Sequence, residues 1–137
     1  MTTRPAPARP QLRATRQRAA VAELLMRVEG FRSAQDLHEL LRREGAAVGL
    51  TTVYRHLQAL VDAGEVDMLR DDDGAVVYRR CESDGHHHHL VCRSCGVAVE
   101  IDGPEVEAWL GRVAAGHGFG DVTHRVEVFG TCAACAT

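Results

Sequence analysis

The stretch LTTVYRHLQALVDAGEVDMLRDDDGAVVYRR, residues 50–80, pairs an amphipathic helix with a β-hairpin. Its first half places Val53, Leu57 and Leu60 on one helical face, and Gly64 ends the helix. Two short strand-like runs follow, and the D-D-D-G between them is a turn signal. A helix that leads into a hairpin predicts the winged form of the helix-turn-helix, with this helix as the DNA reader.

Two further helices are predicted upstream of this stretch. The first begins at the N-cap residue Thr15 and ends at Gly30, and the second is capped by Ser33 and stopped by Gly45. Residues 1–11 hold three of the four prolines, so we expect a flexible basic arm there. Three helices and a hairpin complete the predicted winged helix.

Downstream of Cys81 the pattern changes. Short strands are expected at HHLVC and VAVEI, a helix at PEVEAWLGRVAAG with Pro104 in its first turn, and a last strand at DVTHRVEVF. The predicted fold class is therefore α+β with two domains. A winged helix-turn-helix domain covers residues 1–80, a hinge covers 81–85, and a second, α/β domain covers 86–137.

The charge distribution also divides the chain into a front and a back half. The net charge is −3, but residues 1–61 carry ten Arg and five acidic residues, whereas residues 62–137 carry six Arg and fourteen acidic residues. A basic front half is typical of a surface that meets a polyanion such as DNA. No apolar run is long enough for a membrane span, and no secretory signal precedes the first helix. We therefore expect a cytoplasmic protein without membrane contact, whose five cysteines stay reduced.

Four cysteines form two C-x-x-C pairs, Cys92 with Cys95 and Cys132 with Cys135. Each pair can supply two corners of a tetrahedron around zinc, and four thiolates make a closed site that supports the fold. The alternatives are two unrelated thiol pairs or a thioredoxin-like redox motif, but no βαβ context favours the latter. The spacing predicts a structural zinc site.

Four consecutive histidines precede the first C-x-x-C. In a strand, His86 and His88 would face one way and His87 and His89 the other, which predicts two metal sites rather than one. A solvated polar loop is the alternative. The candidates to complete the two sites are Cys81 and Asp67 on one face, and Glu105 or Glu107 with His124 on the other.

These motifs carry a resemblance to a known family. LTTVYRHLQALVDAG, HHHHLVCRSCG and the terminal C-x-x-C, in this order, resemble the ferric uptake regulator family of metal-dependent repressors, and within it the zinc uptake regulator branch. The resemblance covers residues 13–135. It implies a homodimer that binds double-stranded operator DNA through the winged helix and dimerises through the second domain. It also implies up to three Zn²⁺ per chain. It implies no catalytic residues and no small-molecule substrate.

The resemblance also implies residue roles. Besides the structural zinc, it implies a sensor zinc and a second regulatory zinc, and it implies side chains that contact DNA. The sensor ligands would be Asp67, Cys81, His87 and His89. The second regulatory ligands would be His86, His88, Glu107 and His124. The DNA-contacting residues would be Arg13, Thr52, Tyr54, Arg55 and Gln58.

Two departures from the family pattern favour zinc over iron. His88 stands where most relatives have aspartate, and Phe31 and Arg32 stand where iron-sensing relatives carry histidine. A set that contains the Cys81 thiolate is softer than an iron site. Two alternative functions remain. The chain could be an iron or peroxide sensor of the same family, or a zinc storage or chaperone module. A zinc deaminase is disfavoured because the H-x-E pattern is absent.

Overall fold

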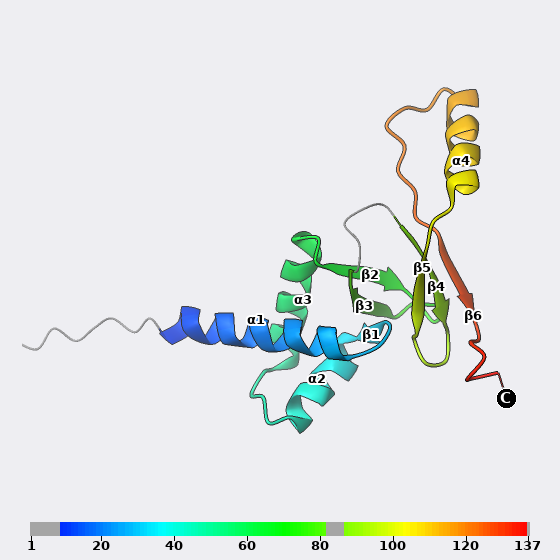
Figure 1. Cartoon of the computed structure of the whole chain (residues 1–137). Coiled ribbons are helices and arrows are strands. Elements are labelled where there is room, and N and C mark those ends of the chain that lie inside the picture. The colour runs from blue at the N-terminus through cyan, green and yellow to red at the C-terminus, as the bar shows by residue number, and fades with distance from the viewer. Residues whose placement is uncertain (1–8, 82–86, 137) are drawn as a thin grey trace, which may run out of the picture. The chain divides into compact units, whose positions relative to one another are not determined.

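The computed structural model describes residues 9–81 and 87–136, which divide into two compact units, Met1–Cys81 and Glu82–Thr137. Figure 1 shows one unit built mainly from helices and the other built from short strands and the helix α4 (Pro104–Gly116). Three parts of the sequence predictions lie outside the described residues: residues 1–8 of the expected arm, residues 82–85 of the expected hinge, and His86.

The first unit contains three helices and a three-stranded antiparallel sheet, and this confirms the predicted helix-turn-helix with a wing. The sheet has the order β1-β3-β2, and β2 and β3 form the wing hairpin. In chain order the elements are α1 (Arg9–Arg27), β1 (Arg32–Ser33), α2 (Ala34–Arg43), α3 (Leu50–Asp62), β2 (Val66–Arg70) and β3 (Val76–Arg80).

Local signals explain where α2 and α3 begin and end. The Ser33 side chain accepts a hydrogen bond from the Asp36 backbone N–H at 3.1 Å, which caps α2. Gly45 and Gly64 follow α2 and α3 with φ of +82° and +75°, a conformation that glycine adopts without strain. The apolar faces of the helices then meet in one core, whose largest fully buried side chains are Val21, Leu37, Leu41, Val53 and Leu57.

Two predictions for this unit need correction. The first helix begins at Arg9 rather than Thr15, so the end of the expected arm is helical. Pro10 does not prevent this, because the first turn of a helix leaves backbone N–H groups unbonded in any case. The sequence pattern also missed β1, whose two residues pair with Tyr78 and Val77 of β3. A strand of two residues is too short to show alternation.

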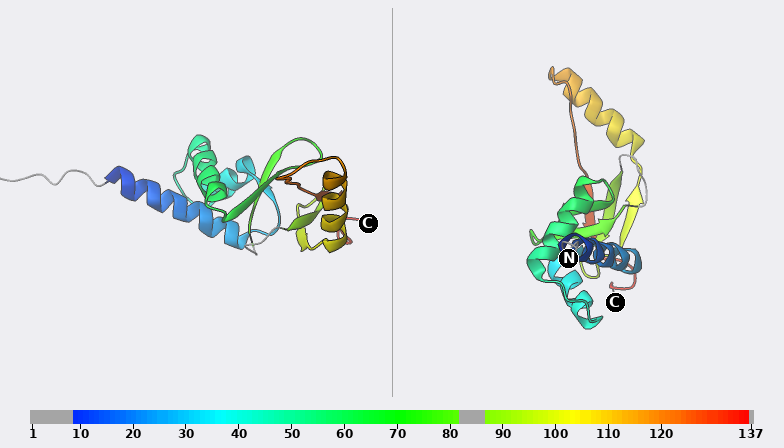
Figure 2. Two further views of the ribbon diagram at one scale, coloured as in Figure 1. Left: turned by 90° about the horizontal axis from the view of Figure 1, so that it is seen from above. Right: turned by 90° about the vertical axis from the view of Figure 1, so that its left-hand side faces the viewer.

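The second unit is a small mixed sheet with one helix. Its strands have the order β5-β4-β6, with β4 antiparallel to β5 and parallel to β6. Figures 1 and 2 show the helix extending beyond the ends of β4 and β5. The elements are β4 (His88–Cys92), β5 (Ala98–Ile101), α4 (Pro104–Gly116) and β6 (Glu127–Gly130).

The last strand is shorter than predicted. The pattern DVTHRVEVF predicts a strand over residues 121–129, but β6 begins at Glu127, and His124 therefore lies in the segment before it. Pairing explains the difference, because the register with β4 begins at the pair His89 and Glu127 and β4 itself begins at His88. Residues before Glu127 thus have little of β4 left to pair with.

Much of the apolar surface of the second unit is exposed. Leu90 of β4 lies opposite both Val99 of β5 and Val128 of β6, and these three side chains are 43%, 55% and 44% exposed. We call them the apolar sheet row. The helix α4 has no buried residue, and its Trp109 is 56% exposed. Side chains of this size on a small domain are typical of a surface that another protein covers.

Candidate metal centres and nucleic-acid interface

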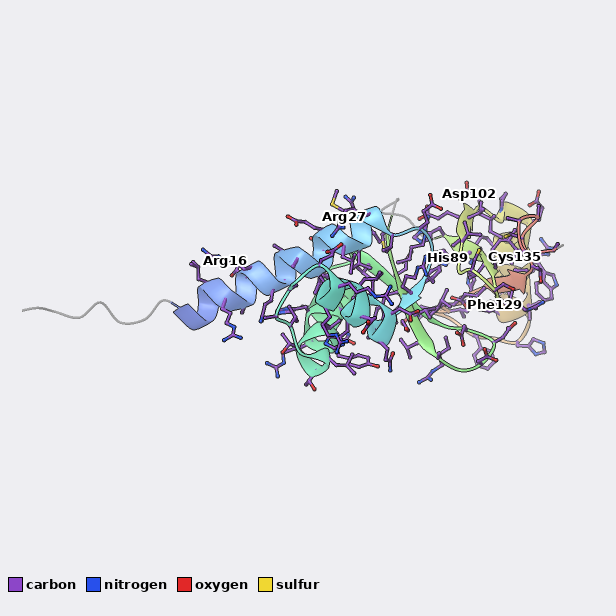
Figure 3. The ribbon with its side chains drawn as sticks, turned by 90° about the horizontal axis from the view of Figure 1, so that it is seen from below. Arg16, Arg27, His89, Asp102, Phe129 and Cys135 are labelled. Carbon is purple, nitrogen blue, oxygen red and sulfur yellow. The ribbon has the colours of Figure 1, made fainter. Side chains whose placement is uncertain are left out.

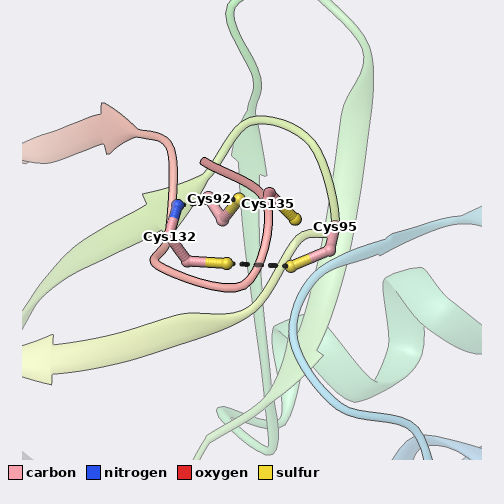
Figure 4. A group of neighbouring side chains, drawn as sticks. All are labelled: Cys92, Cys95, Cys132 and Cys135. Carbon is pink, nitrogen blue, oxygen red and sulfur yellow. Dashed lines mark hydrogen bonds between the residues drawn. The ribbon is translucent and has the colours of Figure 1, made fainter. Parts of the chain in front are cut away.

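The four cysteines of the C-x-x-C pairs lie together at one end of the second unit. Cys92 is the last residue of β4, and Cys132 follows β6 by one residue. Each pair closes a tight turn in which a backbone N–H donates to the first cysteine's carbonyl: Gly96 to Cys92 at 2.9 Å, and Cys135 to Cys132 at 3.0 Å. Two such turns bring all four sulfurs to one place (Figure 4).

The sulfur positions match a zinc tetrahedron. All four Sγ atoms lie within 4.8 Å of one another, and the Sγ atoms of Cys95 and Cys132 are 3.8 Å apart. A tetrahedron with the usual Zn–S length has S–S edges of about 3.8 Å. The four residues present therefore fit a structural zinc ion in number, type and spacing.

The electrostatics of the cysteines agree with this fit. Backbone N–H groups, first that of Cys132 and then those of Cys95 and Ser94, lower the pKa of the Cys92 thiol to about 6. The neighbouring thiols, Cys132 first, raise the pKa of Cys135 to about 12, because a thiolate is disfavoured beside other sulfur groups. A divalent cation would supply the charge that four adjacent thiolates need.

A second group of metal-binding side chains lies on one face of β4. His88 Nε2 is 2.6 Å from Glu107 Oε1, and His124 Nε2 is 2.8 Å from Glu107 Oε2. The two imidazole rings are 5.3 Å apart. The structure thus brings three of the four predicted second-site residues together, and Glu107, not Glu105, is the helix carboxylate among them. Two imidazoles and a carboxylate fit zinc.

The other side of the histidine run carries a third group. The rings of His87 and His89 are 4.8 Å apart and perpendicular, and His87 Nε2 lies 3.8 Å from Glu100 Oε1. Glu100 is opposite His89 in the β4–β5 register. Sequence reasoning missed Glu100, although a hairpin alignment of HHLVC with VAVEI would have placed it beside the histidines. Both histidines are largely buried.

Two further predicted ligands lie together in the first unit. Asp67 is on β2, antiparallel to the strand that ends just before Cys81. The Cys81 Sγ donates to Asp67 Oδ1 at 3.0 Å. A thiol and a carboxylate at this distance can both reach one metal ion, because ligand atoms around zinc lie about 3–4 Å apart.

The helix α3 divides into a buried and an exposed face. Val53 and Leu57 are fully buried, whereas Arg55 and Gln58 are exposed and Tyr54 is 39% exposed. Gln58 Nε2 donates to Asp62 Oδ1 at 2.8 Å one turn later. All five residues predicted to contact DNA lie in the first unit: Arg13, Tyr54, Arg55 and Gln58 are exposed, and Thr52 is partly buried.

None of the helices that the structure describes combines the length and apolar character that a bilayer-spanning segment requires.

Comparison with known proteins places these features in one family. The sequence profile of the ferric uptake regulator family matches residues 9–129. The chain is 58% identical over 124 residues to the zinc uptake regulation protein of Mycobacterium tuberculosis, covering 90% of this chain and 95% of that one. It is 36% identical over 123 residues to the ferric uptake regulation protein of Shigella flexneri, covering 89% and 82%.

Solved structures agree with the sequence comparison. The crystal structure of the M. tuberculosis zinc uptake regulator FurB aligns with a TM-score of 0.54 over 90% of this chain and 95% of that one, at 58% identity. A zinc uptake regulator complexed with zinc and DNA aligns with a TM-score of 0.70 over 87% and 80%, at 31% identity. The chain belongs to the ferric uptake regulator family.

Proposed function

We propose that this chain is a zinc-responsive repressor that binds operator DNA as a homodimer and controls genes of zinc uptake. The observation that favours zinc over iron is the position of the Cys81 thiol at the end of the wing hairpin. Its Sγ lies 3.0 Å from Asp67 Oδ1. Thiolate ligands select zinc over harder ions. The relatives named for zinc uptake regulation and for a complex with zinc and DNA support the same function.

The donor groups support up to three zinc sites per chain. We assign the structural ion to the four cysteines of the C-x-x-C pairs. The ligands of the sensor ion would be Asp67, Cys81, His87 and His89, with Glu100 beside His87 as an orienting carboxylate. The ligands of the second regulatory ion would be His86, His88, Glu107 and His124.

The sensor residues suit a switch because they come from both units. Bound zinc supplies a compact double charge with tetrahedral geometry. Asp67 lies on the wing hairpin and Cys81 directly follows it, while His87 directly precedes β4 and His89 lies on it. Drawing all four to one point would restrict how the winged helix is presented to DNA. Zinc would thus favour the DNA-competent conformation through its higher affinity for it.

DNA recognition is assigned to the exposed face of α3. Arg55 can form a bidentate pair with a guanine edge, and Tyr54 can contact a thymine methyl group or a phosphate. Thr52 and Gln58 flank them on the same helix, and Arg13 of α1 supplies a further positive charge. In the homodimer, two such helices would enter successive major grooves of the operator.

We expect a second copy of the chain to bury the apolar sheet row. Leu90, Val99 and Val128 are each about half-exposed, and α4 adds Trp109. Burying such side chains in an isologous interface contributes roughly 25 cal/mol for each Å² removed from water. The homodimer therefore accounts for apolar surface that a monomer would leave in solvent.

Zinc-dependent DNA binding of matched variants tests the proposal. Cys81→Ser and Asp67→Asn should each weaken zinc-dependent binding in gel-shift titrations, by about tenfold or more if the sensor ligand is lost. Asp36→Asn, which removes a carboxylate from the first turn of α2, is the matched control and should bind as the wild type does. Equal zinc dependence of all four proteins would rule out the sensor assignment.

A further inference from the structure

A groove runs along the first unit between the N-terminal half of α1 and the segment that leads into α3. Its volume is about 670 Å³. Figure 3 shows Arg16, one of its lining residues, on the N-terminal half of α1. The full lining is Leu12, Arg13, Arg16, Gln17, Ala20, Ala46, Ala47 and Val48.

The groove combines an apolar lining with positive charge. Leu12 is 54% exposed, and the other apolar lining residues are Ala20, Ala46, Ala47 and Val48. Arg13 and Arg16 are both exposed, and none of the eight lining residues is acidic. Since they are three residues apart on a helix, the two guanidinium groups lie on neighbouring positions of one face. A ligand with negative charge and apolar carbon surface would match this lining.

The walls of the groove are tied together. Gln17 Nε2 of α1 donates to the Ala47 carbonyl oxygen at 3.3 Å. The helix α1 also packs directly against α3 and α2. The helix that forms one wall of the groove is therefore held in place by the packing that forms the core of the unit.

The position of the groove identifies its ligand. Residues 46–48 lead directly to Gly49, the N-cap of α3. When a helix-turn-helix docks on DNA, the N-terminal residues of the reading helix contact the bases. The groove adjoins the segment that leads into α3 and is lined by Arg13, which the proposed function assigns to DNA. The backbone of DNA bound at α3 is therefore the anionic ligand within its reach.

We propose that this groove seats the sugar–phosphate backbone of one DNA strand. Arg16 contacts a phosphate oxygen, and Leu12 and Ala47 contact the deoxyribose carbons. Arg16 thereby joins the residues assigned to DNA, as a contact that positions α3 without reading sequence. The inference rests on the proposed function, because it requires that DNA is the partner of α3.

Two variants at Ala47 test whether the groove contacts phosphate. Their side chains differ in charge but hardly in size or shape. Ala47 is exposed, so a longer side chain there does not disturb the core. Ala47→Glu places a carboxylate beside the phosphate, and Ala47→Gln places a neutral side chain of the same size. We expect Ala47→Glu to bind DNA at least about tenfold more weakly than Ala47→Gln, because a like charge opposes phosphate contact. Equal affinities would overturn the inference.

A second pair of variants tests Arg16. Arg16→Gln is compared with Arg43→Gln, which removes the same charge from the end of α2, where Arg43 pairs with Glu39. The probes are a duplex of about 30 base pairs, selected from random DNA by the zinc-loaded wild type, and an unrelated duplex of the same length. Arg16→Gln should reduce the slope of log affinity against log salt by about one per subunit on both duplexes.

The two sets of results separate the inference from the function it rests on. If the zinc-loaded wild type selects no duplex, the proposed function fails and the inference fails with it. If the wild type binds, but Arg16→Gln keeps the salt slope of Arg43→Gln, the groove does not hold the backbone although α3 still reads DNA. Circular dichroism melting of each variant confirms that the fold is retained.

Discussion

His56 is a buried histidine on α3 that the proposed DNA and zinc sites leave unused. Its side chain is 9% exposed, and its Nε2 makes no hydrogen bond with any described protein group. Burial lowers the pKa of His56, and the positive charges of Arg18 and Arg55 lower it further. The imidazole is therefore held neutral in the folded unit.

This arrangement predicts a dependence of stability on pH. Because folding lowers the pKa of His56, the unfolded chain binds the proton more tightly, and protonation favours unfolding. The neutral imidazole contributes fully to the free energy of unfolding above the pKa of about 6.5 that His56 has in the unfolded chain. This contribution is lost as the pH falls below that value. Hydrogen exchange of the α3 amides, corrected for intrinsic rates, should lose more protection as the pH falls in the wild type than in His56→Gln. The control, His38→Gln on α2, should follow the wild type, and a wild-type curve parallel to that of His56→Gln would contradict the prediction.

The donor side chains show what residue patterns can and cannot predict. The two C-x-x-C pairs predict one cluster because four thiols at such spacing have few other uses. The alternation of the histidines also follows from strand geometry, and His88 and His87 do face different partners, Glu107 and Glu100. Glu100 escaped prediction because only the register of β4 with β5 brings it beside His89.

At the scale of elements, the two cysteine pairs join the ends of two strands. The strand β6 contacts β4 through only four register pairs. Cys132 and Cys135 lie shortly after β6, while Cys92 ends β4 and Cys95 follows it. The proposed structural zinc would thus hold β6 in place where the short ladder alone is weak.

Removing one of these ligands should release the strand. We expect Cys132→Ala to lose its most tightly held zinc and to show amide exchange in β6 at least about tenfold faster, because zinc binding stabilises only the folded site. The neighbouring variant Thr131→Ala changes an exposed side chain and should keep both zinc and protection. Unchanged exchange in zinc-free Cys132→Ala would show that the strand does not depend on the ion.

Element boundaries were predictable only where a local signal sets them. Ser33 caps α2, and Gly64 follows α3, so those ends match the sequence. The start of α1 and the start of β6 have no such signal. The helix continues through the residues before Thr15, and β6 begins where the register with β4 begins, at Glu127. Strand length in this unit is therefore set by a partner strand, which a single-sequence pattern does not contain.

At the scale of the whole molecule, the apolar sheet row predicts the oligomeric state. Leu90 is its central member, paired with Val99 on one side and Val128 on the other. Leu90→Glu should convert the dimer to a monomer in light scattering, because a desolvated carboxylate without a partner opposes burial. Ala133→Glu adds the same charge at an exposed position outside the row and should stay dimeric. A dimeric Leu90→Glu protein would place the interface elsewhere.

The central claim is that zinc occupancy controls DNA binding. The most direct measurement follows both quantities in one sample: zinc per chain by elemental analysis and DNA affinity by fluorescence anisotropy, after mild chelation and during stepwise return of zinc. We predict that about one zinc per chain resists chelation, and that affinity rises by about 100-fold as further zinc binds. Equal affinity at every zinc occupancy, or a rise with iron(II) and not with zinc, would contradict the account.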